Sequence, residues 1–236
     1  MVTLDMVTLD TVAWDALRLS LWVAVWTTVI AVPLALWVAW ILARREFWGK
    51  SLVSALVHLP LVLPPVVTGY VLLLIFSPSA PVGAALASVG LTLAFTWTGA
   101  VLAAIVMGFP LMVRAMRLAI EAVDPRLEDA AATLGASRAG VFTRVTLPLI
   151  APGILAGAVM GFAKAMGEFG ATITFVANIP GQTQTLPIAI WTALQIPGGE
   201  GAAAAMALLS CAVALGAVFI SEALARRVAT RIGSRT

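Results

Sequence analysis

The chain has 236 residues, of which 61% are hydrophobic and 11% are charged, with a formal net charge of +3. Because soluble domains carry about 45–50% apolar and about 25% charged residues, this composition excludes an ordinary soluble domain, a disordered chain and a nucleic-acid binder. The single cysteine, Cys211, and the single histidine, His58, exclude a disulfide framework and the usual zinc and haem sites, so we expect no metal and no cofactor.

Long apolar stretches predict an all-α polytopic membrane protein with five transmembrane helices. A helix needs about 20 mostly apolar residues to cross the hydrocarbon core of a bilayer. The predicted spans cover residues 19–43, 52–76, 91–113, 147–167 and 202–224. We expect residues 1–18 to form a periplasmic N-terminal segment, residues 114–146 a long cytoplasmic loop, and residues 225–236 a cytoplasmic tail.

The distribution of basic residues predicts how the chain is oriented. Twelve of the 14 Lys and Arg residues lie in three segments, 44–50, 114–146 and 226–236. Five spans place all three segments on one side of the membrane, and basic loops favour the cytoplasmic side. We therefore expect a bacterial inner-membrane protein with its N-terminus outside and its C-terminus in the cytoplasm.

The second predicted span contains Pro60, Pro64 and Pro65, which interrupt regular helical hydrogen bonding. Broken helices are tolerated in membranes where protein or a cavity surrounds them, so this span either lines a pathway or carries a packing kink. His58 lies in the same span, and we expect it to be a satisfied polar residue rather than a proton relay.

The cytoplasmic loop carries the signals of two short helices. Asp124 and Pro125 can begin the first helix, and Gly135 can end it in a left-handed conformation. Leu127, Ala130, Ala131 and Leu134 then share one apolar face. Ser137 can cap a second helix over residues 138–145. The pattern fits either a docking element for a soluble partner or a solvated amphipathic loop.

The spacing of this loop resembles the EAA loop of type I ABC importer permeases. The matching residues are Asp129, Ala130 and Ala131, then Gly135, Val145, Leu147 and Pro148. The family pattern usually has Glu where this chain has Asp129, and Ile where it has Val145. The resemblance implies the fold of that family over residues 19–224, and a coupling helix that docks into a groove of an ATP-binding subunit.

The resemblance extends from about Ser20 to Arg227 and is strongest to permeases for molybdate. Sulfate permeases share a version of Gly167-Glu168-Phe169-Gly170, whereas residues 171–175, 178–181 and 195–200 look more like the molybdate branch. It implies passage of molybdate, with tungstate carried as well. Sulfate or thiosulfate is the alternative substrate, and a secondary anion transporter or channel is the alternative class.

Five spans are too few to enclose a pathway, so we expect two copies of this permease around a two-fold axis. The resemblance implies two ATP-binding cassette subunits and one periplasmic molybdate-binding protein as further partners. The sequence contains no phosphate-binding loop and no G-x-S-x-G or H-E-x-x-H motif. We therefore expect no catalytic site in this chain, and no nucleic-acid partner.

Small residues recur on the fourth predicted span at Gly153, Gly157 and Gly161. Glycines four residues apart let helices approach closely, so this stripe predicts a packing face near the pore or the partner permease. The alternative is a flexible or water-lined helix.

Polar residues near the end of the fourth span are candidates for a pathway or gate. Lys164 and Glu168 are four residues apart and can pair on one helix face, either as a gate or as a wet ion pair near the outer end of the span. Thr172 and Thr174 follow, and their hydroxyls could line a path for an oxyanion without trapping it.

Overall fold

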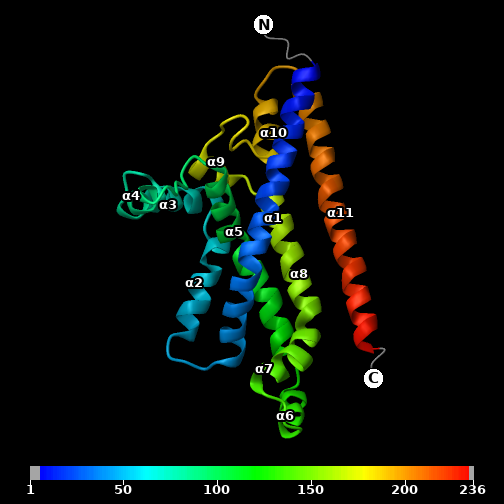
Figure 1. Ribbon diagram of the computed structural model, residues 1–236. Coiled ribbons are helices and arrows are strands. Elements are labelled where there is room, and N and C mark those ends of the chain that lie inside the picture. Colours follow the sequence, from blue (N-terminus) through cyan, green and yellow to red (C-terminus); the bar gives the residue numbers. More distant parts are fainter. Residues whose placement is uncertain (1–5, 234–236) are drawn as a thin grey trace.

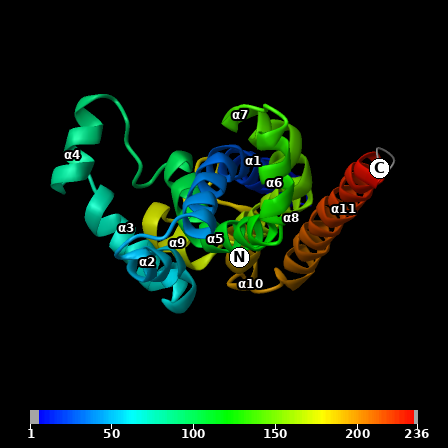
Figure 2. The ribbon, with the colours of Figure 1, turned by 90° about the horizontal axis from the view of Figure 1, so that it is seen from below.

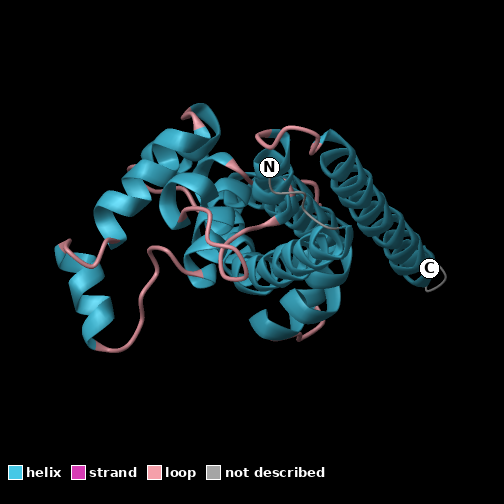
Figure 3. Cartoon of the chain, turned by 90° about the horizontal axis from the view of Figure 1, so that it is seen from above, coloured by secondary structure: helices cyan, strands magenta, loops and turns pink. Residues whose placement is uncertain are grey.

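The computed structural model describes residues 6–233, and every regular element in this part of the chain is a helix (Figure 3). The first five residues of the predicted N-terminal segment and the last three of the predicted tail lie outside the described residues. The elements are α1 Met6–Arg44, α2 Lys50–Val62, α3 Pro65–Phe76, α4 Pro81–Ser88, α5 Trp97–Glu121, α6 Pro125–Thr133, α7 Arg138–Val141, the π-helix η1 Phe142–Thr146, α8 Leu147–Met166, α9 Gly170–Val176, α10 Leu186–Leu194 and α11 Glu200–Gly233.

Within the described residues, four helical stretches are long and apolar enough to cross a membrane. They cover Thr11–Arg44, Trp97–Glu121, Arg138–Met166 and Glu200–Ala217. A fifth span exists if the bent pair α2 and α3 counts as one. The all-helical membrane fold expected from the sequence is thus confirmed.

The second predicted span, 52–76, is not one continuous helix. It is divided between α2 and α3, whose axes are bent by 114°. Leu63 between them is extended, with φ −74° and ψ 143°. Proline disfavours the helical conformation in the residue before it, so the Leu63-Pro64-Pro65 sequence ends α2 and lets Pro65 begin α3.

Several helix ends differ from the predicted spans. The third predicted span, 91–113, is a loop as far as Thr96, and α5 then runs beyond Val113 to Glu121. Thr96 fixes this start because its side chain accepts a hydrogen bond from the Gly99 N–H at 3.3 Å. The terminal helices also exceed their predicted spans, with 39 residues in α1 and 34 in α11. Apolar length marks where a span lies, but local caps decide where its helix begins.

The long helices α1, α5, α8 and α11 form an elongated bundle, while α3 and α4 project to one side (Figure 1). The α1–α2 connection, α6 and the described end of α11 lie toward the same end of this bundle, opposite the start of α1 (Figure 1). Seen from below, α6 and α7 lie over that end, with α11 set apart at one side (Figure 2). The described parts of the three basic segments therefore share one end.

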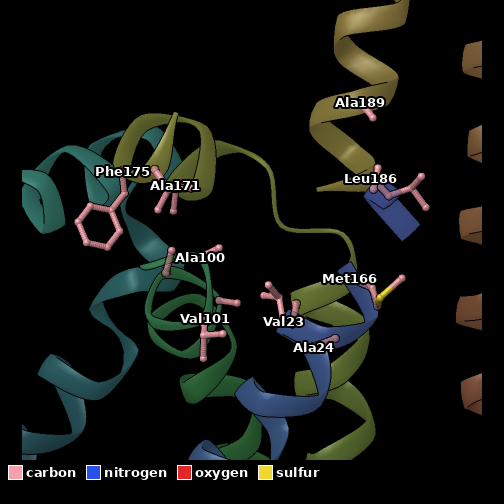
Figure 4. Packing of buried hydrophobic residues seen from close by; sticks show 14 of the residues in the cluster. Val23, Ala24, Ala100, Val101, Met166, Ala171, Phe175, Leu186 and Ala189 are labelled. Atoms are coloured by element: carbon pink, nitrogen blue, oxygen red, sulfur yellow. The ribbon is translucent and has the colours of Figure 1, made fainter. Parts of the chain in front are cut away.

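Two clusters of buried apolar residues hold the bundle together. In the cluster toward the α6 end, Ala31, Ala35 and Ala39 of α1 are fully buried together with Met112 and Met116 of α5. Small residues every fourth position let two membrane helices approach closely. The other cluster joins α1, α5, α9 and α10 through residues such as Ala24, Ala100, Phe175 and Leu186 (Figure 4).

The glycine stripe of α8 packs inside the chain, against α5. A Cβ on Gly153 would lie 2.2 Å from Ala119 Cβ, and one on Gly157 would lie 3.2 Å from the Met112 carbonyl oxygen. A Cβ on Gly161 would overlap the Met112 side chain. The stripe thus packs closely against a neighbouring helix of the same protomer, and its predicted place near the pore or the partner permease stays a prediction.

Candidate functional site

The α6 helix begins and ends where the sequence predicts. The Asp124 side chain accepts a hydrogen bond from the Arg126 N–H at 2.9 Å, and Pro125 occupies the first turn. At the other end Gly135 is left-handed, with φ +88°. The N–H groups of Gly135 and Ala136 then bond to the carbonyls of Ala132 and Ala131, at 3.0 and 3.1 Å, which closes the helix as a Schellman motif.

This helix presents an apolar face at the exposed end of the bundle. No residue of α6 is buried; Leu127 is 49% exposed and Leu134, just beyond it, is 90% exposed. Asp129 and Ala130 are also exposed, and Ala131 is half-buried. An exposed apolar helix face of this kind suits docking into a groove of a partner. The remaining residues of the EAA-like motif are half-buried at the start of α8: Val145, Leu147 and Pro148.

The second predicted short helix is not separate from the fourth span. Ser137 caps it, since its hydroxyl accepts a hydrogen bond from the Gly140 N–H at 3.2 Å. Beyond that cap, α7, η1 and α8 form one unbroken stretch, Arg138–Met166, of 29 residues. A proline displaces the carbonyl four residues before it, and the π turn just before Pro148 accommodates that displacement. The docking region therefore continues directly into a membrane helix.

Three polar side chains tie α6 to the bundle, and we call them the Glu128 latch. Glu128 Oε1 lies 3.2 Å from Arg44 Nη2 at the end of α1. The same oxygen accepts a hydrogen bond from the Thr146 hydroxyl at 2.6 Å, and Thr146 is only 1% exposed. Glu128 thus links α6 both to the end of α1 and to the start of α8.

Aromatic contacts support the latch. The Arg44 guanidinium lies 5.7 Å from the centre of the Trp40 ring, and Trp40 meets Phe142 edge-to-face with centroids 5.2 Å apart. No sequence pattern indicated Arg44, Glu128 or Thr146 as site residues. The first two lie 84 positions apart, so no local spacing could have brought them together.

The second candidate site lies where α8 ends. Lys164 Nζ lies 2.5 Å from Glu168 Oε2, and the other oxygen of Glu168 accepts a hydrogen bond from the Ala171 N–H at 2.9 Å. The Glu168 side chain is 2% exposed, against 28% for Lys164. The carboxylate therefore both neutralises a lysine and holds the first turn of α9.

This ion pair lies beside α5, and its role as a gate or as a wet pair near the outer end of the span stays a prediction. A Cβ on Gly108, close to the middle of α5, would lie 3.9 Å from Lys164 Cβ. The helical residues 138–146, predicted to be a separate cytoplasmic element, are continuous with α8. A buried carboxylate in a membrane bundle is expensive, and with its lysine partner it marks a functional candidate.

Two helix breaks meet beside this ion pair, at residues 63–65 and 167–170, and we call the region the broken-helix junction. A Cβ on Gly170 would lie 2.7 Å from Pro65 Cβ, and one on Gly69 would lie 2.4 Å from the Ala171 carbonyl oxygen. The backbones of α3 and α9 therefore touch. Irregular backbone at membrane depth is tolerated where protein surrounds it or where it lines a pathway.

Thr172 and Thr174, the two threonines predicted to line a path, both lie on α9. Thr172 is buried, and the Thr174 hydroxyl donates to the Gly170 carbonyl of its own helix at 2.9 Å. The hydroxyl proton of Thr174 is therefore already used in this hydrogen bond. Among the described residues, no group of three His, Cys, Asp or Glu side chains could hold a metal ion.

Comparison with curated proteins gives relatives that match nearly the whole chain. It is 52% identical over 221 residues to the molybdenum transport system permease protein ModB of Escherichia coli K12, covering 93% of this chain and 96% of that protein. It is 50% identical over 220 residues to ModB of Haemophilus influenzae, with the same shares covered.

Solved structures show the same fold at low sequence identity. A bacterial ABC transporter that imports the acidic polysaccharide alginate superposes with a TM-score of 0.71 at 21% identity, covering 90% of this chain and 78% of that one. The MetNI methionine ABC transporter in an inward-facing conformation gives a TM-score of 0.67 at 18% identity, covering 97% and 99%. Residues 31–230 also match the family model for the binding-protein-dependent transport system inner membrane component, and the chain belongs to that family.

Proposed function

We propose that this chain is the permease subunit of an ATP-driven importer and forms the membrane pathway for molybdate, with tungstate carried as well. The observation that carries the proposal is the 52% identity, over 93% of the chain, to a molybdenum transport permease. Because these relatives are named as molybdenum transport permeases, the similarity favours molybdate over sulfate as the substrate. The chain itself supplies the pathway, and a separate subunit supplies ATP hydrolysis.

The proposed complex has two copies of this permease, two ATP-binding cassette subunits and a periplasmic molybdate-binding protein. A structural neighbour with a TM-score of 0.72, the alginate transporter, is known in complex with its periplasmic protein. The basic end of the bundle, which carries α6, faces the cytoplasm in this proposal. A cysteine replacing Ser137 should then resist a membrane-impermeant thiol reagent added to intact cells. Ready labelling would show that the topology is the opposite one.

The Glu128 latch gives α6 a physical route to the pathway. When ATP binding closes the two cassettes, the docked α6 helices move with them. Glu128 passes the movement to Arg44 and Thr146, and hence to α1 and α8. Because α8 runs without a break to Met166, a rigid shift at its start reaches the broken-helix junction at its end. Movement there separates α3 from α9 and opens the path.

The closed junction prevents leakage between transport cycles. Backbone contact at Gly69 and Gly170 leaves no room for an anion between α3 and α9. The Lys164–Glu168 pair holds the start of α9 and keeps the lysine charge neutralised until the junction opens. A pathway of this kind binds its ion weakly, which allows release.

The decisive experiment is ATP-driven uptake by the reconstituted complex in vesicles. Labelled molybdate should accumulate only with ATP and the loaded binding protein, and unlabelled tungstate should compete at similar concentrations. Sulfate should compete poorly. Efficient sulfate uptake with slow molybdate uptake would assign the chain to the alternative substrate, and uptake by the permease alone would assign it to another transporter class.

A further inference from the structure

An open pocket of about 490 Å³, which we call the cavity, is lined by one face of α2 and by Arg117 of α5. Five residues of α2 and one of α5 line it: Lys50, Ser51, Ser54, Ala55, His58 and Arg117. Every polar side chain of α2 is in this group, and all other residues of the helix are apolar. The polarity of α2 is therefore concentrated on one cavity.

The spacing of these residues explains how they gather. Lys50, Ser54 and His58 follow one another at intervals of four, so they form a ladder along one face of α2. The ladder rises about 12 Å from Lys50 to His58 at 1.5 Å per residue. Polar side chains within a membrane span face the protein interior or a water-filled cavity. Here they face Arg117 across the cavity.

The hydrogen-bond donors of the cavity exceed its acceptors. Lys50 Nζ pairs with Glu46 at 2.6 Å and Arg117 Nε pairs with Glu121 at 2.7 Å, and neither glutamate lines the cavity. Arginine carries five N–H donors, and the contact of Arg117 to Glu121 uses one of them, at Nε. His58 Nδ1 lies 2.7 Å from the Ser54 carbonyl oxygen, which leaves the opposite ring nitrogen, Nε2, for another partner.

We propose that this cavity is a low-affinity site for a hydrated tetrahedral oxyanion, occupied by the transported anion after it passes the broken-helix junction. The inference rests on the proposed function, and it assigns residues to the release step. Two basic side chains, an imidazole and two hydroxyls suit the oxygen atoms of such an anion. The pocket is open to solvent, so the anion can keep its hydration shell there.

The position of the cavity fits a release step. The α2 helix runs from Lys50 at its cytoplasmic end, past His58, to the break at Leu63 that forms part of the junction. Weak binding by a few dispersed charges would draw an anion out of the junction without holding it. The phosphate of an acidic lipid has the same chemistry, so the experiment must separate the two sources.

The test measures anion attraction into the cavity without ATP. Ser54→Cys is introduced into a Cys211→Ser background, and the importer complex is placed in phosphatidylcholine vesicles with its cytoplasmic face outward. Labelling rates are compared for a methanethiosulfonate reagent carrying a sulfonate and one carrying a trimethylammonium group. Arg117→Gln should lower the ratio of the two rates about five-fold. Lys50→Gln should lower it in the same direction.

The matched control is Arg114→Gln, which removes an exposed arginine from the same region of α5 but outside the cavity. This change should leave the ratio within about a factor of 1.5, because exposed charges are screened. Millimolar molybdate should slow labelling by the sulfonate in phosphatidylcholine vesicles. An unchanged ratio in both Arg117→Gln and Lys50→Gln would overturn the proposal.

Lipid composition separates the two sources of the anion. If phosphatidylglycerol in the vesicles slows the sulfonate reagent while molybdate has no effect in phosphatidylcholine, the cavity binds lipid, and the release site is ruled out. Protection by molybdate without acidic lipid supports the proposal. Because labelling needs no ATP, a failure here can be told apart from a failure of molybdate uptake by the complex.

Discussion

The two ends of α8 show two different ways of building a functional region. At its start the helix is continuous with an exposed docking element, fixed by local caps and by one latch through Glu128. At its end it stops at a buried ion pair, among helices whose backbones touch at Gly69 and Gly170. We therefore expect the fold to tolerate changes in the first region better than changes in the second.

The largest effect should come from adding a single methyl group where α3 and α9 touch. Gly69→Ala places a Cβ 2.4 Å from a backbone oxygen of α9, which cannot move aside as a flexible side chain could. Overpacking of this kind costs about 1–3 kcal/mol, and we expect most of the assembled permease to be lost. Gly201→Ala is the matched control, since nothing lies within 4 Å of a Cβ there.

Yield of the assembled complex and its thermal unfolding temperature measure this effect. Gly201→Ala should behave as the wild-type protein. A wild-type yield and unfolding temperature for Gly69→Ala would mean that α3 and α9 separate readily, and that the junction is not a packed element.

Changes at the docking helix should abolish transport but spare the permease. Ala131→Arg puts a long charged side chain on the docking face, and Gly135→Val forces a β-branched residue into a left-handed conformation at φ +88°. A Cβ at Gly135 meets nothing within 4 Å, so the cost is local strain alone. We expect molybdate uptake to fall more than about ten-fold, equivalent to about 1.4 kcal/mol or more of docking energy.

Co-purification of the ATP-binding subunit, measured beside uptake, checks this prediction. The permease should still insert and assemble as a dimer in both variants. If both retain the ATP-binding subunit and normal uptake, α6 is only a surface loop.

A smaller effect is expected from neutralising the buried ion pair. Glu168→Gln can still accept the Ala171 N–H but leaves Lys164 without its counter-charge. We expect uptake to fall about five-fold, and Lys164→Met together with Glu168→Gln to recover part of it, because residues in contact are not additive. Uptake assays on Glu168→Gln, Lys164→Met and the double variant complete a double-mutant cycle. Strictly additive losses would show that the two residues act independently.

How much the sequence could predict depended on the range of each interaction. Asp124, Pro125 and Gly135 act within their own helix turn, so their spacing predicted α6 correctly. The prolines at 64 and 65 signalled a break, but not its 114° bend, which depends on packing against α9. The glycine stripe indicated close packing without indicating its partner, because lipid-facing and protein-facing positions of α8 are equally apolar.

The Glu128 latch could not be predicted for the same reason. Glu128 lies 84 positions from Arg44 and 18 from Thr146, and each residue taken alone is an ordinary polar side chain near a membrane surface. Likewise, the position of the Lys164–Glu168 pair followed from the unbroken helix 138–166, which the cap at Ser137 and the proline at 148 concealed.

The central claim is that the docking helix moves the junction through the Glu128 latch. The most direct measurement is the number of molybdate ions imported per ATP hydrolysed by a Glu128→Ala complex in vesicles, beside Arg44→Lys as the charge-conserving variant. The Glu128→Ala complex should bind the ATP-binding subunit and hydrolyse ATP, while the ratio falls about three-fold. That fall is equivalent to about 0.7 kcal/mol, within the net worth of one hydrogen bond at about 0.5–1.5 kcal/mol. Arg44→Lys should keep most of the ratio. An unchanged ratio in Glu128→Ala would contradict the claim, because the movement would then reach the junction by another route.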